Sequence, residues 1–197
     1  MLTGIGAPTA WPFFKRAGGP AVIRTVLGKN TAILSLTIQL NAINVAVGDM
    51  LMVGVVNDNR VLAGAPVVDL NGNNLNVDAS RTYLTLRLEI HSLLIPAAVV
   101  LGTLTATWAV APTNSAMLAI KVSGLVGTRK ANLNPVGANT ANPDSGTTAA
   151  YAAAKNFHFG CVGTVGNGAD LLGVWQNAMT AGQQRVSRQS AHRWALT

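Results

Sequence analysis

Few residues in this chain of 197 could do chemistry: seven acids, three histidines and one cysteine. The acids are Asp49, Asp58, Asp69, Asp78, Glu89, Asp144 and Asp170. Most stand within two residues of a Gly or Asn, as in Gly48-Asp49 and Asn57-Asp58, where an Asp side chain usually hydrogen-bonds its own turn. Two carboxyl groups could together cleave a glycosidic bond, but nothing in the spacing selects a pair. We therefore interpret these acids as turn formers.

Metal binding is the other chemistry that these residue types offer. A Ca²⁺ site can be built from Asp58, Asp69 or Asp78, because this ion takes oxygen ligands in loops. The spacings of the EF-hand loop and of the nonapeptide Ca²⁺ repeat are both absent. The histidines are His91, His158 and His192. None stands at a metal-ligand spacing from another His or Cys, so we expect no metal and no other cofactor.

The single cysteine, Cys161, lies in the apolar run "FHFGCVGTV". A catalytic thiol needs a nearby base, but His158 is three positions away, which in a strand puts it on the opposite face. The glycines of "GCVGTVGNG" match neither the dinucleotide fingerprint nor the P-loop. A Gly-x-Ser-x-Gly nucleophile elbow is also absent. We therefore interpret Cys161 as a small buried side chain and expect the protein not to be an enzyme.

Charge gives the first indication of a partner. The chain has 14 basic and 7 acidic residues, a formal net charge of +7, which favours an anionic partner. Only 11% of residues are charged, a composition that is common in subunits of large protein assemblies. The short basic clusters are Lys15-Arg16, Arg129-Lys130 and the set Arg185, Arg188 and Arg193. Because these cations are scattered and lack interleaved aromatics, nucleic acid is disfavoured as the partner.

A membrane location is not indicated. The longest apolar run, "LLIPAAVVL" at 93–101, is about half the length of a spanning helix and contains Pro96. The segment 1–20 lacks a basic region followed by an apolar stretch, so it does not resemble a secretory signal. We expect the protein to fold in the cytoplasm of the cell that makes it.

Strand periodicity runs through the chain from residue 31 onward. Alternation in "TAILSLTIQL" at 31–40 predicts one strand with its apolar residues on a single face. The run Met50–Val56 is apolar on both faces, which indicates a central, doubly covered strand. Asn71-Gly72 is a strong hairpin signal. In "TYLTLRLEIH" at 82–91 the leucines are expected inward, with Arg87 and Glu89 outward.

Two further alternating runs flank the break "APTNSA" at 111–116. We expect them to form an antiparallel hairpin, with Trp108 in the core beside Leu104 and Ala106. About eight or nine short strands follow one another at about ten-residue intervals, without a convincing amphipathic helix. This pattern predicts an all-β protein, an antiparallel β-sandwich of jelly-roll-like type.

The chain divides into three expected parts, which are an extended N-terminal arm at 1–30, a β-sandwich domain at 31–184 and a basic C-terminal strand or tail at 185–197. Closely spaced prolines in the arm forbid a long helix. Burial of each of its aromatic side chains would stabilise the protein by about 1.5–3 kcal/mol, a gain that is absent if the arm stays in solvent. We therefore expect the arm to dock on its own domain or on a neighbour.

With the strands placed, four segments resemble a β-sandwich of structural proteins in tailed bacteriophages. They read "VAVGDMLMVGVV", "VVDLNGNNLNV", "LTATWAVAPTNSAMLAIKVSGL" and "NPDSGTTAAYAAAKNFHFGCVGTVG". The resemblance covers residues 43–175 and consists of hydrophobic alternation and turns. Further strands usually follow the "GVW" segment in those domains. Here the sandwich would be closed by residues 185–197, or one edge stays open for a partner strand.

The resemblance implies a virion surface role without catalytic residues. We expect a decoration (cement) protein that binds the capsid exterior, with the major capsid protein or other virion proteins as partners, forming a homo-oligomer on the particle. The expected contact residues are Trp11, Phe13, Phe14, Lys15, Arg16, Arg185, Arg188 and Arg193. The alternatives are a tail or fibre component and a carbohydrate-binding jelly roll, for which Trp108 and Trp175 are the available aromatics.

Overall fold

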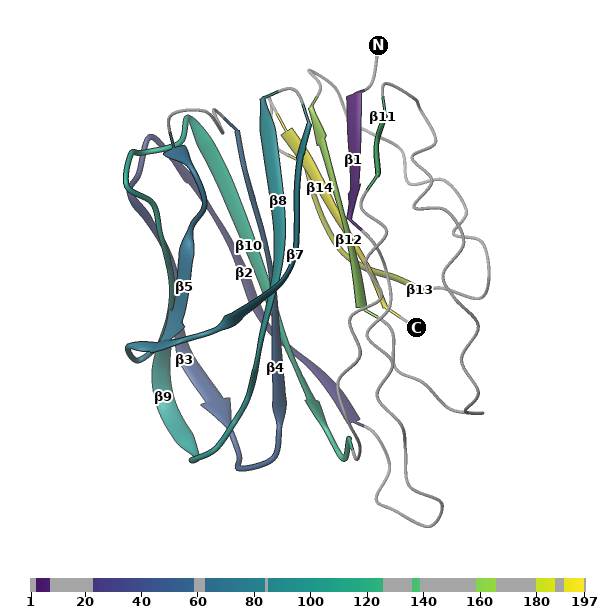
Figure 1. Cartoon of the computed structure of the whole chain (residues 1–197). Coiled ribbons are helices and arrows are strands. Elements are labelled where there is room, and N and C mark those ends of the chain that lie inside the picture. Colours follow the sequence, from purple (N-terminus) through teal and green to yellow (C-terminus); the bar gives the residue numbers. More distant parts are fainter. Residues whose placement is uncertain are drawn as a thin grey trace.

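The computed structural model describes residues 3–7, 23–58, 63–83, 85–125, 136–138, 159–165, 180–186 and 190–196 (Figure 1). For residue 83 and for the segments before 23 and after 125, the description covers the backbone path and not the side chains. The protein is an all-β antiparallel sandwich, as predicted, and its described strands form three sheets.

The central sheet has the order β2 (Ile23–Ile33), β10 (Asn114–Ser123), β4 (Met50–Asn57), β8 (Leu86–Leu94) and β7 (Asn76–Tyr83). The outer sheet has the order β3 (Thr37–Val45), β9 (Val99–Thr107), β5 (Val67–Leu70) and β6 (Asn73–Asn74). The terminal sheet has the order β11 (Val136–Ala138), β1 (Thr3–Ala7), β12 (Phe159–Val165), β14 (Ser190–Leu196) and β13 (Thr180–Val186).

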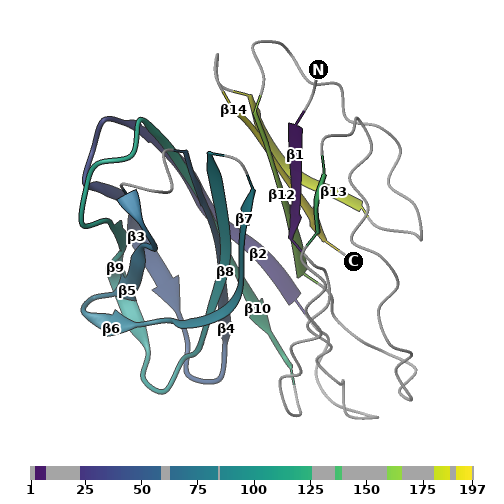
Figure 2. The same ribbon diagram turned by 45° about the horizontal axis from the view of Figure 1, so that its top comes forward.

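The three sheets lie in layers, with the central sheet between the other two (Figure 2). One core fills the space between the central and outer sheets and includes Leu51, Val53 and Trp108. A second cluster, which includes Met52 and Leu118, lies on the other face of the central sheet. That face is the one approached by the terminal sheet, since β1 and β12 contact β8.

Strand β4 is buried along its whole length, which confirms the doubly covered strand predicted for Met50–Val56. Its residues alternate between the two cores, so neither face of the strand meets water. The turn predicted at Asn71-Gly72 is also confirmed, between β5 and β6. Both residues have positive φ, 50° and 81°, the combination that a two-residue type I′ hairpin requires.

The hairpin predicted across the "APTNSA" break is wrong. Strand β9 pairs with β3 and β5 in the outer sheet, whereas β10 pairs with β2 and β4 in the central sheet. The connection therefore crosses from one layer to the other. Trp108, just after β9, and Met117 of β10 therefore lie in the same core, between the outer and central sheets. In a flat hairpin both residues would belong to one sheet.

The single strand predicted over 31–40 is also interrupted. Strand β2 ends at Ile33, the chain turns through Leu34 at a positive φ of 48°, and β3 begins at Thr37 in the other sheet. Ile38 and Leu40 are buried as expected, but Leu34 and Leu36 are exposed at the turn. The alternation of apolar and polar residues thus continues across the point where the chain passes from the central sheet to the outer sheet.

The predicted divisions of the chain fall as follows. The boundary at residue 30 lies inside β2, so residues 23–30 belong to a strand of the central sheet. Residues 3–7 form β1 of the terminal sheet, and the rest of the predicted arm, 1–2 and 8–22, lies outside the described residues. Within 185–197, Ser190–Leu196 form β14 between β12 and β13.

Candidate functional site

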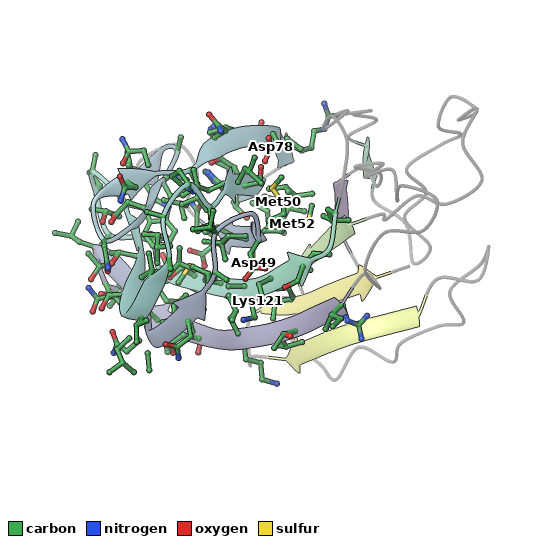
Figure 3. All side chains as sticks on the ribbon, turned by 90° about the horizontal axis from the view of Figure 1, so that it is seen from below. Asp49, Met50, Met52, Asp78 and Lys121 are labelled. Carbon is green, nitrogen blue, oxygen red and sulfur yellow. The ribbon has the colours of Figure 1, made fainter. Side chains whose placement is uncertain are left out.

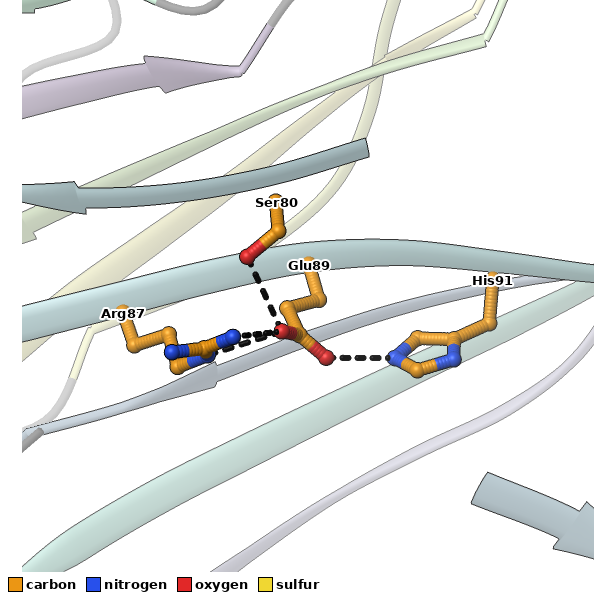
Figure 4. Close-up of polar contacts among 4 residues, drawn as sticks. All are labelled: Ser80, Arg87, Glu89 and His91. Carbon is orange, nitrogen blue, oxygen red and sulfur yellow. Dashed lines mark hydrogen bonds and ion pairs between the residues drawn. The ribbon is translucent and has the colours of Figure 1, made fainter. Parts of the chain in front are cut away.

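A charged cluster lies where β7 and β8 pair (Figure 4). Its centre is the carboxylate of Glu89. Oε1 accepts hydrogen bonds from Ser80 Oγ at 2.9 Å and from Arg87 Nε at 2.7 Å, and Arg87 Nη2 lies 2.6 Å from the same oxygen. Oε2 lies 3.0 Å from His91 Nε2, which donates to it. Every oxygen of this carboxylate is therefore satisfied.

The pleat of β8 explains why Glu89 and His91 meet. Their positions pair across the ladder with Val55 and Val53 of β4, which belong to the core under the outer sheet. Glu89 was expected to face outward, and this expectation is wrong: Glu89 and His91 are each 1% exposed. The outer sheet covers the face that alternation alone assigned to solvent.

Burial and partners act on the acid in opposite directions. Burial alone would raise the pKa of Glu89, but the hydrogen bond and charge of His91, together with those of Arg87, outweigh it. The net effect holds the pKa of Glu89 below its ordinary value of 4.5, so the side chain is ionised at neutral pH. Since a substrate cannot reach the sealed side chains, this geometry fits a structural ion cluster and not a catalytic pair.

The other described acids are also engaged within the molecule. Both oxygens of Asp58 accept hydrogen bonds at 2.7 Å from Asn114, one from its backbone and one from its side chain. Asp69 Oδ1 accepts the backbone N–H of Gly72 at 2.7 Å, as a turn former does. Asp78 is buried and not without a partner. Within the described residues, no group of three or more His, Cys, Asp or Glu could hold a metal ion.

Asp49 anchors one end of the central sheet. Its Oδ1 accepts a hydrogen bond from Ser123 Oγ at 2.5 Å, and its Oδ2 accepts the backbone N–H of Ala46 at 2.9 Å. Lys121 Nζ lies 3.9 Å from Oδ2 and donates to the backbone oxygen of Asn44 at 3.1 Å. Figure 3 labels the side chains of Asp49 and Lys121. This acid therefore closes the turn before β4.

Two cations differ from the rest of the described charges. Arg24 and Lys29, both on the edge strand β2, are exposed and make no ion pair or hydrogen bond within the described structure. They pair across the ladder with Val122 and Leu118, which share one face of the central sheet. Strand β2 carries no acid, so these two cations give this edge of the central sheet a positive exterior.

Exposed apolar side chains gather at both ends of the sandwich. The Leu34 end exposes Ile33, Leu34, Leu36, Val67 and Val110. The Leu101 end exposes Val47, Leu94, Val100 and Leu101. Hydrogen bonds hold the segments of the first end together, from Leu34 N to Thr113 O at 3.1 Å and from Trp108 N to Leu36 O at 2.9 Å. Alternation missed the first of these ends, because it placed Leu34 and Leu36 on the apolar face of a single strand.

Leu34 and Leu101, after which the two ends are named, both have a backbone in the left-handed region. Leu34 has φ 48° and Leu101 has φ 53°, and each side chain is 71% exposed. A non-glycine residue in this left-handed region costs about 1–2 kcal/mol, and an exposed leucine gains no compensating burial within its own chain. Leu34 and Leu101 therefore combine a strained backbone with an apolar side chain that is mostly exposed in the isolated molecule.

The contact residues predicted from the sequence fall mostly outside the described residues, namely Trp11, Phe13, Phe14, Lys15, Arg16 and Arg188. The backbone register places Arg185 opposite His192 and Arg193 opposite Gln184, which brings the two arginines to neighbouring positions of β13 and β14. Trp108 is 2% exposed, so it is core as predicted and is not available to stack on a sugar.

The chain matches no protein-family model, no curated protein and no solved structure. Within the part of the chain that the structure describes, a helix long and apolar enough to cross a membrane is not found. The candidate functional surface therefore rests on the chemistry of the molecule itself, namely its two apolar ends and its exposed basic edge.

Proposed function

We propose that the protein is a non-enzymatic structural component of a tailed-bacteriophage virion, which binds the capsid exterior and stabilises the shell as a decoration protein. The observation that carries the proposal is the pair of apolar ends, each with a strained and exposed leucine. Exposed apolar patches on soluble proteins mark surfaces that another protein covers. Burial by a neighbour would supply the apolar contact that Leu34 and Leu101 lack in the isolated chain.

A non-enzymatic role is supported by the described acidic and histidine side chains, which are buried or hydrogen-bonded within the protein. Glu89 and His91 are sealed in the core, and Asp58 and Asp69 are committed to hydrogen bonds at turns. Layered β-sandwiches with short connections are well suited to rigid surface attachment, because most of their backbone hydrogen bonds are satisfied within the sheets.

The proposal includes the chain ends as additional contacts. The arm aromatics would bury apolar area against the major capsid protein or another virion protein, and Lys15 and Arg16 beside them would add charge complementarity. The basic residues Arg185, Arg188 and Arg193 would do the same from the other end of the chain. On the particle the protein would form a homo-oligomer, with one apolar end toward the shell and the other toward neighbouring copies.

The test substitutes the two exposed leucines and measures occupancy on purified particles that lack the protein. Leu34→Asn and Leu101→Asn each remove an apolar contact, while Asn tolerates a positive φ better than Leu does. Each variant is expected to fold with unchanged or higher stability and to occupy fewer sites than the native chain. Val77→Thr is the matched control, since Val77 is also exposed but lies on β7 and belongs to neither of the two ends.

Full occupancy by both Asn variants, at a protein concentration that half-saturates the native chain, would contradict docking through the ends. Reduced occupancy by the Val77→Thr control to the same extent would contradict it as well. Attachment of the native chain to tails and not to capsids would replace the decoration role with that of a tail component.

A further inference from the structure

Strand β2 is the edge of the central sheet, and its outer side is not paired by another described strand. It is 11 residues long, pairs with β10 on one side only, and keeps most of its side chains at least partly in solvent. An edge of this length presents a row of backbone N–H and C=O groups that can receive a further strand. At Thr31 the outward N–H is already bonded to Asn30 Oδ1 at 2.8 Å, so an added strand would displace that side chain or pair with the rest of the edge. Figure 1 shows β2 running along the full height of the sheet.

The other described edges of the central and outer sheets are less suited to receive a strand. Strand β6 has only 2 residues, and β3 changes register twice along its pairing with β9. Strand β7 has a bulge between Val77 and Ala79, where Asp78 is turned into the molecule. Short strands, bulges and inward charges are the devices that block edge pairing. Strand β2 has a single bulge, next to Leu27.

The charges of β2 indicate which partner the edge would accept. Arg24 and Lys29 lie on the same face, opposite Val122 and Leu118, which are four residues apart on β10. Their spacing along the strand is therefore about 13 Å. The strand carries no acid, so two copies of β2 side by side would bring four cations together. The edge therefore opposes self-pairing and favours a strand with carboxylates on the matching face.

We propose that β2 is the docking edge for an extended acidic segment of a partner protein, which adds to the central sheet as a further strand. Backbone hydrogen bonds would supply affinity, and carboxylates spaced four residues apart on one face would pair with Arg24 and Lys29. This inference goes beyond capsid attachment through the apolar ends, because it concerns a different surface and holds for a partner on or off the particle.

A nucleic acid would be attracted by the same two cations but would leave the edge amides without strand partners. The test separates the two by using the full-length protein and synthetic probes. The main probe is an 11-residue peptide of Thr and Val, matched to β2 in length, with Glu at two positions four residues apart. A second peptide carries Lys at those positions. A third keeps Glu but has alternate backbone nitrogens methylated, which removes the donors that pair with an edge. An oligothymidylate is the nucleic-acid probe.

Fluorescence anisotropy is expected to show binding of the Glu peptide and loss of binding for the Lys and N-methylated peptides. The double variant Arg24→Gln with Lys29→Gln should weaken binding by about three- to tenfold, the size expected for two exposed ion pairs. The matched control is Val67→Glu with Val77→Glu, which lowers the net charge by the same two units at exposed positions on β5 and β7, neither of which pairs with β2. This control should bind the Glu peptide as the native chain does.

Three results would overturn the proposal. Equal binding of the N-methylated and unmethylated Glu peptides would show that charge alone is responsible and that strand addition does not occur. Tighter binding of oligothymidylate, in competition with the peptide, would assign the surface to nucleic acid. Absence of peptide binding at millimolar concentration, by a protein that keeps its native melting temperature, would remove the docking edge. None of these results bears on attachment through Leu34 and Leu101, which the occupancy test measures separately.

Discussion

Glu89 Oε2 lies 3.0 Å from His91 Nε2 inside the sandwich, where each residue is almost completely removed from water. The two side chains are neighbours because positions two apart in β8 share one face of the strand. Arg87, on the same face, completes the cluster at its more exposed side. An ionised carboxylate thus sits in the core between two sheets, held by partners from its own strand and from β7.

Acid should destabilise the protein through this cluster. The pKa of Glu89 is lower in the folded protein than its ordinary value of 4.5, so its contribution is fully present above about pH 4.5 and is lost as pH falls through the folded pKa. Thermal melts between pH 7 and about pH 3 should show this loss. Glu89→Gln should cost about 3 kcal/mol at neutral pH and flatten the decline in acid, because the titrating partner is gone. Parallel declines for both proteins would contradict this role.

Trp108 should be a large contributor to stability. Trp108→Ala is expected to cost about 3–5 kcal/mol in the free energy of unfolding, the range for emptying a large aromatic site. The indole N–H makes no hydrogen bond within the described structure, so Trp108→Phe should cost distinctly less. Urea denaturation of the two variants checks this order. An alanine variant of native stability would contradict burial between the two sheets.

Chelator should leave the melting temperature unchanged. Both oxygens of Asp58 are used by Asn114, and Asp69 caps the turn at Gly72, so these carboxylates already have partners without a cation. Differential scanning fluorimetry with and without EDTA, and with added Ca²⁺, makes the comparison. A marked fall in melting temperature on chelation, restored by Ca²⁺, would contradict the prediction and identify a Ca²⁺ site.

The arm aromatics should be needed for attachment and not for folding. Deleting residues 1–20 would also remove β1, which pairs with β11 and β12. The triple substitution Trp11→Ser, Phe13→Ser and Phe14→Ser avoids that loss. This variant should melt as the native chain does and bind particles more weakly, because docked aromatics remove apolar area from water. Native occupancy by the triple variant would contradict an arm that docks on the shell.

Local signals in the sequence predicted local structure well. Asn71-Gly72 forms its hairpin turn because only a pair that accepts positive φ at both positions fits a two-residue loop. The unbroken apolar run at Met50–Val56 predicted a strand covered on both faces, and β4 is one. In both cases the residues themselves carry the physical constraint, so the prediction did not require knowledge of distant partners.

Pairing between strands could not be predicted in the same way. Alternation around the "APTNSA" break fits a hairpin and a crossover between sheets equally well, because both leave the same faces apolar. Leu34 continues the alternation of its neighbours, yet its positive φ starts a turn at which the chain changes sheet. Glu89 was assigned to solvent because a charged residue in an alternating strand usually faces water, and its partners become visible only when β7 and β8 pair.

The most direct test of the decoration role is cryo-electron microscopy of purified virions. Particles that carry the protein are compared with particles that lack it. A regular array of β-sandwich density on the outer capsid surface, present only when the protein is bound and contacting the shell through the Leu34 or Leu101 end, is the predicted result. Density confined to the tail, or particles that neither contain nor bind the protein, would contradict the proposed function.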